Sequence, residues 1–230
     1  LEEINQEIEN VRAAWLWAAQ QVDLVALHEA VEPLYHFYQI QSRFQDGKDL
    51  FVQGWESLRP LSSGDDPAAV VTPVRVLARC GAFCHFLCEY DLAARYLEQG
   101  LALAQKAGEQ AEIAFVLNFL GQLTVWKGEQ ATAQRYLIES LAISQAIGDK
   151  SGAASALEKL ANLTHATFGE YAESKRLAAQ SLALSRELGR PDWIAYALDT
   201  LGFVTFCLGE YADAESYYRE SLSLFEMIGD

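Results

Sequence analysis

Gly169-Glu170-Tyr171 and Gly209-Glu210-Tyr211 are two copies of one short turn sequence, and the spacing of such turns decides the fold. Gly128-Glu129-Gln130 lies 41 residues before the first copy, and Cys88-Glu89-Tyr90 takes the same place 40 residues earlier still. A further glycine follows each turn after 20 residues, at Gly108, Gly148, Gly189 and Gly229. A period near 40 residues that is divided in half indicates repeated pairs of helices of similar length.

These glycines are typical of helix ends, because a residue in the left-handed conformation often follows the last helical turn and glycine adopts it at least cost. Leu188-Gly189-Arg190-Pro191 shows such an ending, followed by a proline that can begin the next helix. Between the turns, hydrophobic residues recur with helical spacing and do not alternate. In the second helices, aligned small residues and aligned leucines recur, and they predict closely approaching helices. These positions are Ala93, Ala133, Ser174 and Ala214, and Leu101, Leu141, Leu182 and Leu222.

The same pattern divides the chain. Residues 1–66 are expected to hold N-terminal helices with a degenerate first pair, and residues 67–230 to hold four hairpins. The hairpins are predicted at residues 68–107, 109–147, 150–188 and 191–228. The 41-residue interval places one extra residue between Leu160 and Gly169, so the helix there is expected to be longer or locally distorted.

Composition limits the classes of function. The 230 residues are 51% hydrophobic, which is enough for a sizeable core, and the net charge of −15 repels phosphate backbones and anionic lipid. No uninterrupted apolar run approaches the roughly 20 residues that span a bilayer. We therefore expect no direct nucleic-acid and no membrane partner. The chain begins without Met or a secretion signal, so we expect an excised fragment of a cytoplasmic protein.

Cysteines and histidines are the candidates for metal or chemical sites. Cys80, Cys84 and Cys88 follow one another along a helical stripe, which spans too far for one zinc ion and has the phase of buried positions in other repeats. Core packing is the preferred interpretation over zinc binding. The four histidines are scattered over different helices, and surface roles are favoured over ligand roles; they are His28, His36, His85 and His165. We predict no metal and no cofactor in this fragment.

The repeated turns and small-residue positions of residues 67–230 resemble the tetratricopeptide repeat family. The resemblance implies an all-α, right-handed superhelical solenoid of tetratricopeptide-like helical hairpins. The long period and Glu139-Ser140-Leu141-Ala142-Ile143 resemble a narrower group, the C-terminal repeat (sensor) region of bacterial signal-transduction ATPases with numerous domains, the STAND proteins. The segments at Glu7–Trp15 and Arg43–Gly47 are similar to the helices that follow the ATPase modules of such proteins. Because no phosphate-binding loop occurs in this sequence, any ATPase module would lie upstream.

In such arrays the first helix of each hairpin lines the concave face, so the resemblance implies a ligand groove there. Phe115, Asn118, Gln122 and Trp126 form one continuous stripe on a first helix. This mixture of aromatic and polar groups suits a binding groove, with packing against the next repeat as the alternative. The candidate ligand-binding residues are Arg75, His85, Phe86, Phe115, Asn118, Gln122, Trp126, Glu158, Asn162, His165, Tyr196, Asp199, Phe203 and Phe206. Glu32, His36 and Gln39 hold the matching face of the degenerate pair.

Three functions remain open, and none is enzymatic, since no nucleophile, base and oxyanion device occur in register. The leading hypothesis is a sensor region in which an inducer, a small molecule or a protein, binds the groove and shifts an autoinhibited state toward an active one. Its partners would be that inducer and the other domains of the parent protein. The alternatives are a general peptide- or protein-docking scaffold and a module that self-associates through its exposed ends.

Overall fold

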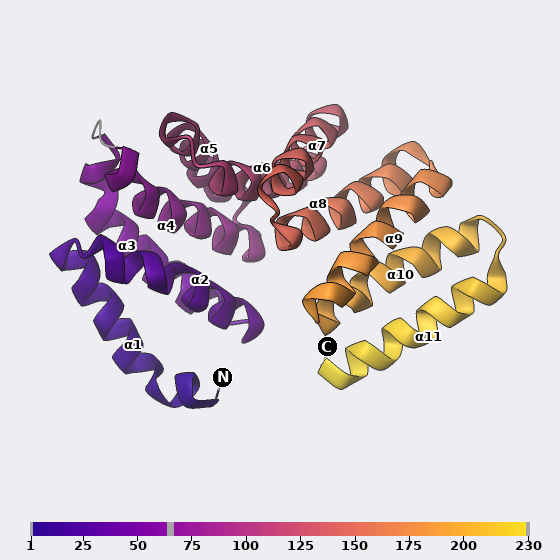
Figure 1. The fold of residues 1–230 in the computed structure, drawn as a ribbon, viewed down its shortest axis with the longest axis horizontal. Coiled ribbons are helices and arrows are strands. Elements are labelled where there is room, and N and C mark those ends of the chain that lie inside the picture. Colours follow the sequence, from indigo (N-terminus) through magenta and orange to yellow (C-terminus); the bar gives the residue numbers. More distant parts are fainter. Residues whose placement is uncertain (1, 64–66, 229–230) are drawn as a thin grey trace. The chain divides into compact units, whose positions relative to one another are not determined.

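The computed structural model describes residues 2–63 and 67–228, and these residues form eleven α-helices packed as consecutive hairpins (Figure 1). The helices are α1 Glu2–Gln21, α2 Leu24–Ile40, α3 Phe44–Leu58, α4 Pro67–Phe86, α5 Tyr90–Ala107, α6 Gln110–Trp126, α7 Gln130–Ile147, α8 Lys150–Leu163, α9 Tyr171–Leu188, α10 Pro191–Cys207 and α11 Tyr211–Ile228. A 3-10 helix, Arg59–Ser63, follows α3. The all-α hairpin repeat predicted from the sequence is thereby confirmed.

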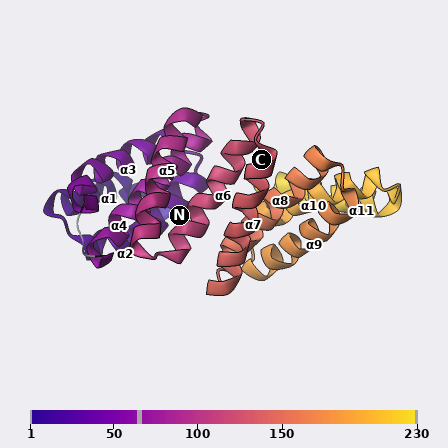
Figure 2. The ribbon, with the colours of Figure 1, turned by 90° about the horizontal axis from the view of Figure 1, so that it is seen from above.

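The chain forms two compact units, which divide inside α6 between Phe119 and Leu120. In unit 1, which runs to Phe119, α4 packs against α2, α3 and α5. In unit 2, from Leu120 onward, α7, α8, α9 and α10 each pack against the helix that follows (Figures 1 and 2). The boundary between these compact units differs from the boundary at residue 66 that the repeat pattern predicts. The boundary at residue 66 stays a prediction.

The turns between helices use left-handed backbone where the sequence places glycine. Gly128 has φ 77°, Gly169 φ 67° and Gly209 φ 81°, and Cys88 takes the equivalent place with φ 59°. Cys80 and Cys84 are buried as expected, but Cys88 is exposed, so its assignment to the core was wrong. The reason is that Cys88 lies in the turn beyond α4, where the helical phase of the other two cysteines no longer applies.

In three of the four hairpins, a large side chain of the second helix lies over a glycine of the preceding first helix. A Cβ atom added at Gly81 would lie 2.6 Å from Leu97 Cγ, one at Gly121 would lie 2.7 Å from Leu137 Cγ, and one at Gly202 would lie 2.8 Å from Tyr218 Cδ1. In the third hairpin the small residue is Ala161, and the aligned second-helix residue is only Ala178; both are fully buried in one core cluster. The two members of each pair therefore complement each other in size, and we name these pairs the hairpin pairs.

The extra residue of the third hairpin is accommodated by a π-helical turn, Thr164–Phe168, at the end of α8. A π-helical turn holds one more residue than an α-helical turn, and such turns often occur at functional sites. The distortion expected from the 41-residue interval is thus confirmed, and we call Thr164–Phe168 the π-turn.

One part of α4, Ala69–Phe86, is long and apolar enough by composition to cross a bilayer, and 72% of it is buried inside the protein. The central helix of a protein core passes the same test. Arg75 and Arg79 lie within this stretch and make ion pairs with neighbouring helices. Burial against α2, α3 and α5 therefore accounts for its apolar composition.

The hairpin pairs predict opposite effects for two glycine-to-alanine changes. Gly121→Ala should lower the free energy of unfolding by about 1–3 kcal/mol, because its Cβ would overlap Leu137. Gly100→Ala should raise the free energy of unfolding by about 0.5–1 kcal/mol. The atom nearest to the new Cβ would lie 3.7 Å away, and alanine has a higher helix propensity than glycine. Urea denaturation measures both changes.

A double-mutant comparison separates steric overlap from other effects at Gly121. In a Leu137→Ala background, Gly121→Ala should no longer destabilise, since the aligned pair Ala161 and Ala178 is accommodated in the same position. An equal loss of stability in both backgrounds would show that the hairpin pair is not the cause.

Candidate functional site

The predicted ligand residues are divided between the two units. Five lie in unit 1 and nine in unit 2. In each unit by itself, we call the side of the first helices that carries these residues the first-helix face; the first helices are α4, α6, α8 and α10.

In unit 1 the predicted residues are packed against other side chains. His85 and Asn118 are buried. Phe86 and Phe115 are half-buried, and each contacts Phe119, with ring centroids 5.8 Å and 4.9 Å apart. In unit 1, therefore, the aromatic residues pack within the protein and do not line an open groove.

Arg79 organises the same face, although the sequence reasoning did not select it. Its guanidinium is 5% exposed, pairs with the carboxylates of Glu32 and Glu112, and lies 3.9 Å above the ring centroid of Phe115. Burial would lower the pKa of Arg79, but the two carboxylates outweigh it and hold that pKa above its ordinary value. Two arginines within an otherwise apolar helix were the sequence signal for this network, since buried charges require partners.

Arg75, which was predicted, joins this network to α2. Its guanidinium donates a hydrogen bond to Glu32 at 3.1 Å and forms an ion pair with Glu112 at 3.2 Å. It also lies 3.0 Å from Nε2 of His28. The same Arg75 nitrogen lies 3.3 Å from Nδ1 of His28, and because an arginine can only donate, the imidazole is the acceptor in this contact. Unit 1 thus surrounds its own arginines with carboxylates, an imidazole and an aromatic ring, although Nε of Arg75 and Nε of Arg79 make no hydrogen bond within the described residues.

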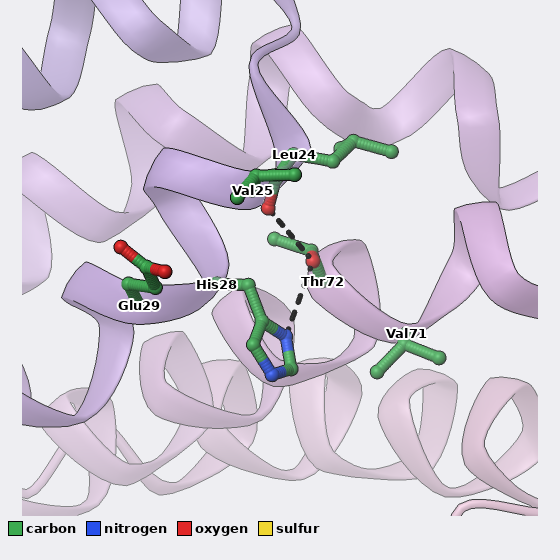
Figure 3. A pocket seen from close by; sticks show the side chains of 6 residues that line it. All are labelled: Leu24, Val25, His28, Glu29, Val71 and Thr72. Carbon is green, nitrogen blue, oxygen red and sulfur yellow. Dashed lines mark hydrogen bonds between the residues drawn. The ribbon is translucent and has the colours of Figure 1, made fainter.

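A cavity of about 370 Å³ opens beside this network between α2 and α4 (Figure 3). The Thr72 hydroxyl lies 3.5 Å from Nδ1 of His28 and donates to the Leu24 carbonyl at 3.4 Å. The lining residues are Leu24, Val25, His28, Glu29, Val71 and Thr72. None of these was among the predicted site residues, because the cavity depends on how two distant helices approach each other.

In unit 2 the polar residues of the first-helix face connect α8 to α10. Asn162 donates to the Glu158 carboxylate and accepts from the Thr200 hydroxyl at 3.2 Å. Burial raises the pKa of Glu158. Three groups from two first helices are thereby held in one chain of hydrogen bonds. Glu158 and Asn162 were predicted, and Thr200 was missed.

His165 lies in the π-turn and contacts Phe203 across the hairpins, with ring centroids 5.0 Å apart. Its Nδ1 lies 3.0 Å from the Ala161 carbonyl and 3.2 Å from Ser174 Oγ. A carbonyl only accepts, so Nδ1 carries the proton and Nε2 presents a lone pair. Burial lowers the pKa of His165, which favours this neutral form.

The aromatic residues of unit 2 are open to solvent. Trp126 is 66% exposed, Tyr196 49%, Phe203 42% and Phe206 55%. Asp199 is also exposed and Gln122 is half-buried. The first-helix face of unit 2 therefore presents aromatic surface beside polar groups, whereas the same face of unit 1 is occupied by its own side chains.

Lys159 is a further residue of this face that sequence reasoning missed. It occupies the repeat position of Arg79, Phe119 and Thr200, and its ammonium donates to Ser155 Oγ at 2.8 Å. Burial lowers the pKa of Lys159, and Glu158 partly offsets the effect. The comparison of all four hairpins at this one position could have identified it. Within residues 2–63 and 67–228, no group of three or more His, Cys, Asp or Glu side chains is placed to hold a metal ion.

The two carboxylates predict opposite dependences of stability on pH. Burial raises the pKa of Glu32, but Arg79 and Arg75 outweigh it, so the folded pKa lies below 4.5 and its stabilisation is lost as pH falls through that lower value. The folded pKa of Glu158 lies above 4.5, so stability increases as pH falls through that higher value. At pH 7, Glu32→Gln should therefore destabilise the protein and Glu158→Gln should stabilise it.

Urea denaturation at pH 7 and at pH 4 measures these effects. The gain from Glu158→Gln should shrink at the lower pH, where the native carboxyl is already protonated. A destabilising Glu158→Gln at neutral pH would contradict the assignment.

Comparisons with known proteins agree with this architecture. Residues 152–227 match the model of the tetratricopeptide repeat family. No curated protein sequence is detectably similar to the chain. Among solved structures, BtubC from P. vanneervenii superposes with a TM-score of 0.74 at 17% identity, over 98% of this chain and 92% of that one.

Two further structures have the same fold. A Rap protein complexed with Competence and Sporulation Factor matches with a TM-score of 0.65 at 14% identity, over 92% of this chain and 66% of the other. A STAND protein with a tetratricopeptide repeat sensor from Pyrococcus horikoshii matches with a TM-score of 0.62 at 16% identity, over 99% of this chain but only 34% of that protein. At these identities the likeness concerns the fold. The chain therefore has a tetratricopeptide-like repeat fold, and residues 152–227 match the tetratricopeptide repeat family itself.

Proposed function

We propose that the first-helix face of unit 2 binds a peptide or protein segment, and that the chain is the sensor region of a cytoplasmic STAND-type signalling ATPase. The observation that carries the binding role is the exposure of four large aromatic side chains beside fixed polar groups on α6, α8 and α10. Exposed aromatic groups supply binding energy when a partner covers them, and the polar groups orient the partner.

The sensor role rests on additional support. The repeat period and the N-terminal helices resemble those of STAND proteins, and the Pyrococcus horikoshii STAND structure covers nearly all of this chain with its fold. The Rap structure is a complex with Competence and Sporulation Factor, which supports the binding of a partner by this architecture. In a sensor, the bound segment would act by binding the active state more tightly than the inactive one.

A general docking scaffold is the second candidate. The match covers 92% of BtubC but only 34% of the STAND protein, so the same fold also occurs in a chain that consists almost entirely of it. The two candidates share the binding face and differ in what binding does. A scaffold would bind its partner with no effect on any ATPase activity.

The binding role predicts that Trp126→Ala removes affinity without unfolding the protein. Peptides selected from a random library against the purified chain provide the probe, and isothermal titration calorimetry measures their affinity. Trp126→Ala should weaken binding by about tenfold or more, because truncation of an aromatic anchor commonly costs 1–2 kcal/mol. Trp17→Ala is the matched control, since Trp17 is 62% exposed but lies on α1. Equal losses in both variants, or no selected peptide at all, would contradict the proposed binding face.

The sensor role is tested on the full-length gene product. A selected peptide should stimulate its ATPase activity, and Trp126→Ala should reduce that stimulation while leaving the basal rate unchanged. Peptide binding with no change in ATPase rate would favour the scaffold.

A further inference from the structure

In unit 1, arginine side chains of the protein itself occupy the first-helix face, and their surroundings indicate which ligand the same face of unit 2 could bind. There, the guanidinium of Arg79 lies over the Phe115 ring at 3.9 Å and pairs with two carboxylates. A guanidinium nitrogen of Arg75 lies 3.0 Å from Nε2 and 3.3 Å from Nδ1 of His28. Unit 1 therefore shows which groups of this protein surround an arginine side chain: an aromatic ring, a carboxylate and an imidazole.

Unit 2 brings the same three kinds of group together. Asp199 and Phe203 are four residues apart on α10 and so lie on one helix face. The π-turn places the His165 ring 5.0 Å from the Phe203 ring, although the two residues belong to different hairpins. Phe203 is 42% exposed and Asp199 is exposed. We call these three residues the acceptor site.

The acceptor site has free capacity to accept hydrogen bonds. Nδ1 of His165 is engaged by Ala161 and Ser174, and within the described chain no group bonds its Nε2. Asp199 forms no ion pair within residues 67–228. A neutral imidazole lone pair and a carboxylate both require donors, and neither offers one.

The arginines of unit 2 are occupied elsewhere. Arg176 pairs with Glu173, Arg186 with Glu220, Arg190 with Asp192 and Arg219 with Glu215. Arg135 lies over the Tyr136 ring on α7. The one cation on the first-helix face of unit 2 in the described residues is Lys159, which donates to Ser155 and interacts with Glu158 rather than with Asp199. In unit 1, Arg79 lies over an aromatic ring of the first-helix face, whereas within the described residues no arginine of unit 2 pairs with the acceptor site.

From this geometry we propose that the acceptor site binds an arginine side chain supplied by the partner segment. The guanidinium stacks on Phe203 and donates to Nε2 of His165 and to the carboxylate of Asp199. Arginine fits better than lysine because its planar group can stack on a ring while donating in its own plane to two acceptors. This inference rests on the proposed binding function, and it names the chemistry that one part of that face recognises.

The one-residue insertion of the third hairpin forms the π-turn, and the π-turn positions His165 in the acceptor site. In the other hairpins the first helix ends in α-helical geometry, while the π-turn holds His165 against α10. Ser174 and the Ala161 carbonyl fix the ring so that Nε2 is the accepting nitrogen. The π-turn therefore acts as a positioning element for an acceptor on the binding face.

Nuclear magnetic resonance of the protein labelled with 15N-histidine tests the proposal directly. The probe is N-acetyl-arginine N-methylamide at millimolar concentration, and the comparison compounds are its citrulline, lysine and glutamate counterparts. Spectra before addition should show His165 as the Nδ1–H tautomer. The arginine compound should shift the Nε2 resonance of His165 and the ring signals of Phe203, citrulline and lysine should shift them less, and glutamate should leave them unchanged.

Substitutions at two exposed residues test whether these resonance shifts arise from binding at the acceptor site. Asp199→Asn and Phe203→Leu should each weaken arginine binding several-fold and leave the thermal unfolding midpoint unchanged, because both side chains are solvent-exposed. Asp213→Asn on α11 is the matched control, since it removes an exposed carboxylate outside the first-helix face and should leave binding unchanged. An Nε2–H tautomer, no response to the arginine compound, or site variants that bind it as well as the unchanged protein does would overturn the proposal.

The failure of this inference can be distinguished from failure of the proposed function. If library-selected peptides bind and Trp126→Ala weakens them, while arginine-containing and arginine-free peptides bind alike, the binding face stands and the arginine assignment is wrong. If no peptide binds, both fail.

Discussion

The contact between a small residue on each first helix and a side chain on the following second helix is the constraint on which the rest of this structure depends. Leu97 covers Gly81, Leu137 covers Gly121, and Tyr218 covers Gly202, each at a distance that leaves no room for a methyl group. Where the small residue is Ala161, the aligned residue shrinks to Ala178. Close approach of this kind fixes how the two helices of a hairpin cross. Their orientation in turn determines which side of each first helix remains available for recognition.

The two units use that available side differently. In unit 1, Arg75 and Arg79 close it with ion pairs to α2 and α6, so charges that would be costly to bury alone are compensated within the protein. In unit 2, the equivalent surface keeps exposed aromatic rings, and within the described residues Nε2 of His165 accepts no hydrogen bond. A single repeat scaffold thus closes this face with its own side chains in one unit and leaves it open for the proposed binding in the other.

The sequence predicted the repeated hairpins, the turns and the distortion of the third hairpin, because these follow from local spacing and from the conformational freedom of glycine. It could not predict the role of Arg79, whose partners Glu32 and Glu112 come from other helices. It also placed Cys88 in the core, since helical phase was extended past the end of α4. His165 was selected as a candidate, but its contact with Phe203 depends on the π-turn, whose geometry a count of residues does not give.

The central claim is that the first-helix face is open in unit 2 and closed in unit 1. Hydroxyl-radical footprinting read by mass spectrometry tests it most directly, because oxidation rates report the exposure of individual aromatic side chains. Trp126, Tyr196 and Phe206 should oxidise quickly and become protected when a selected peptide binds, whereas Tyr35 and Phe119, which are 4% and 8% exposed, should oxidise slowly with or without it. Slow oxidation of the first three residues in the free protein, or no protection on binding, would contradict the account.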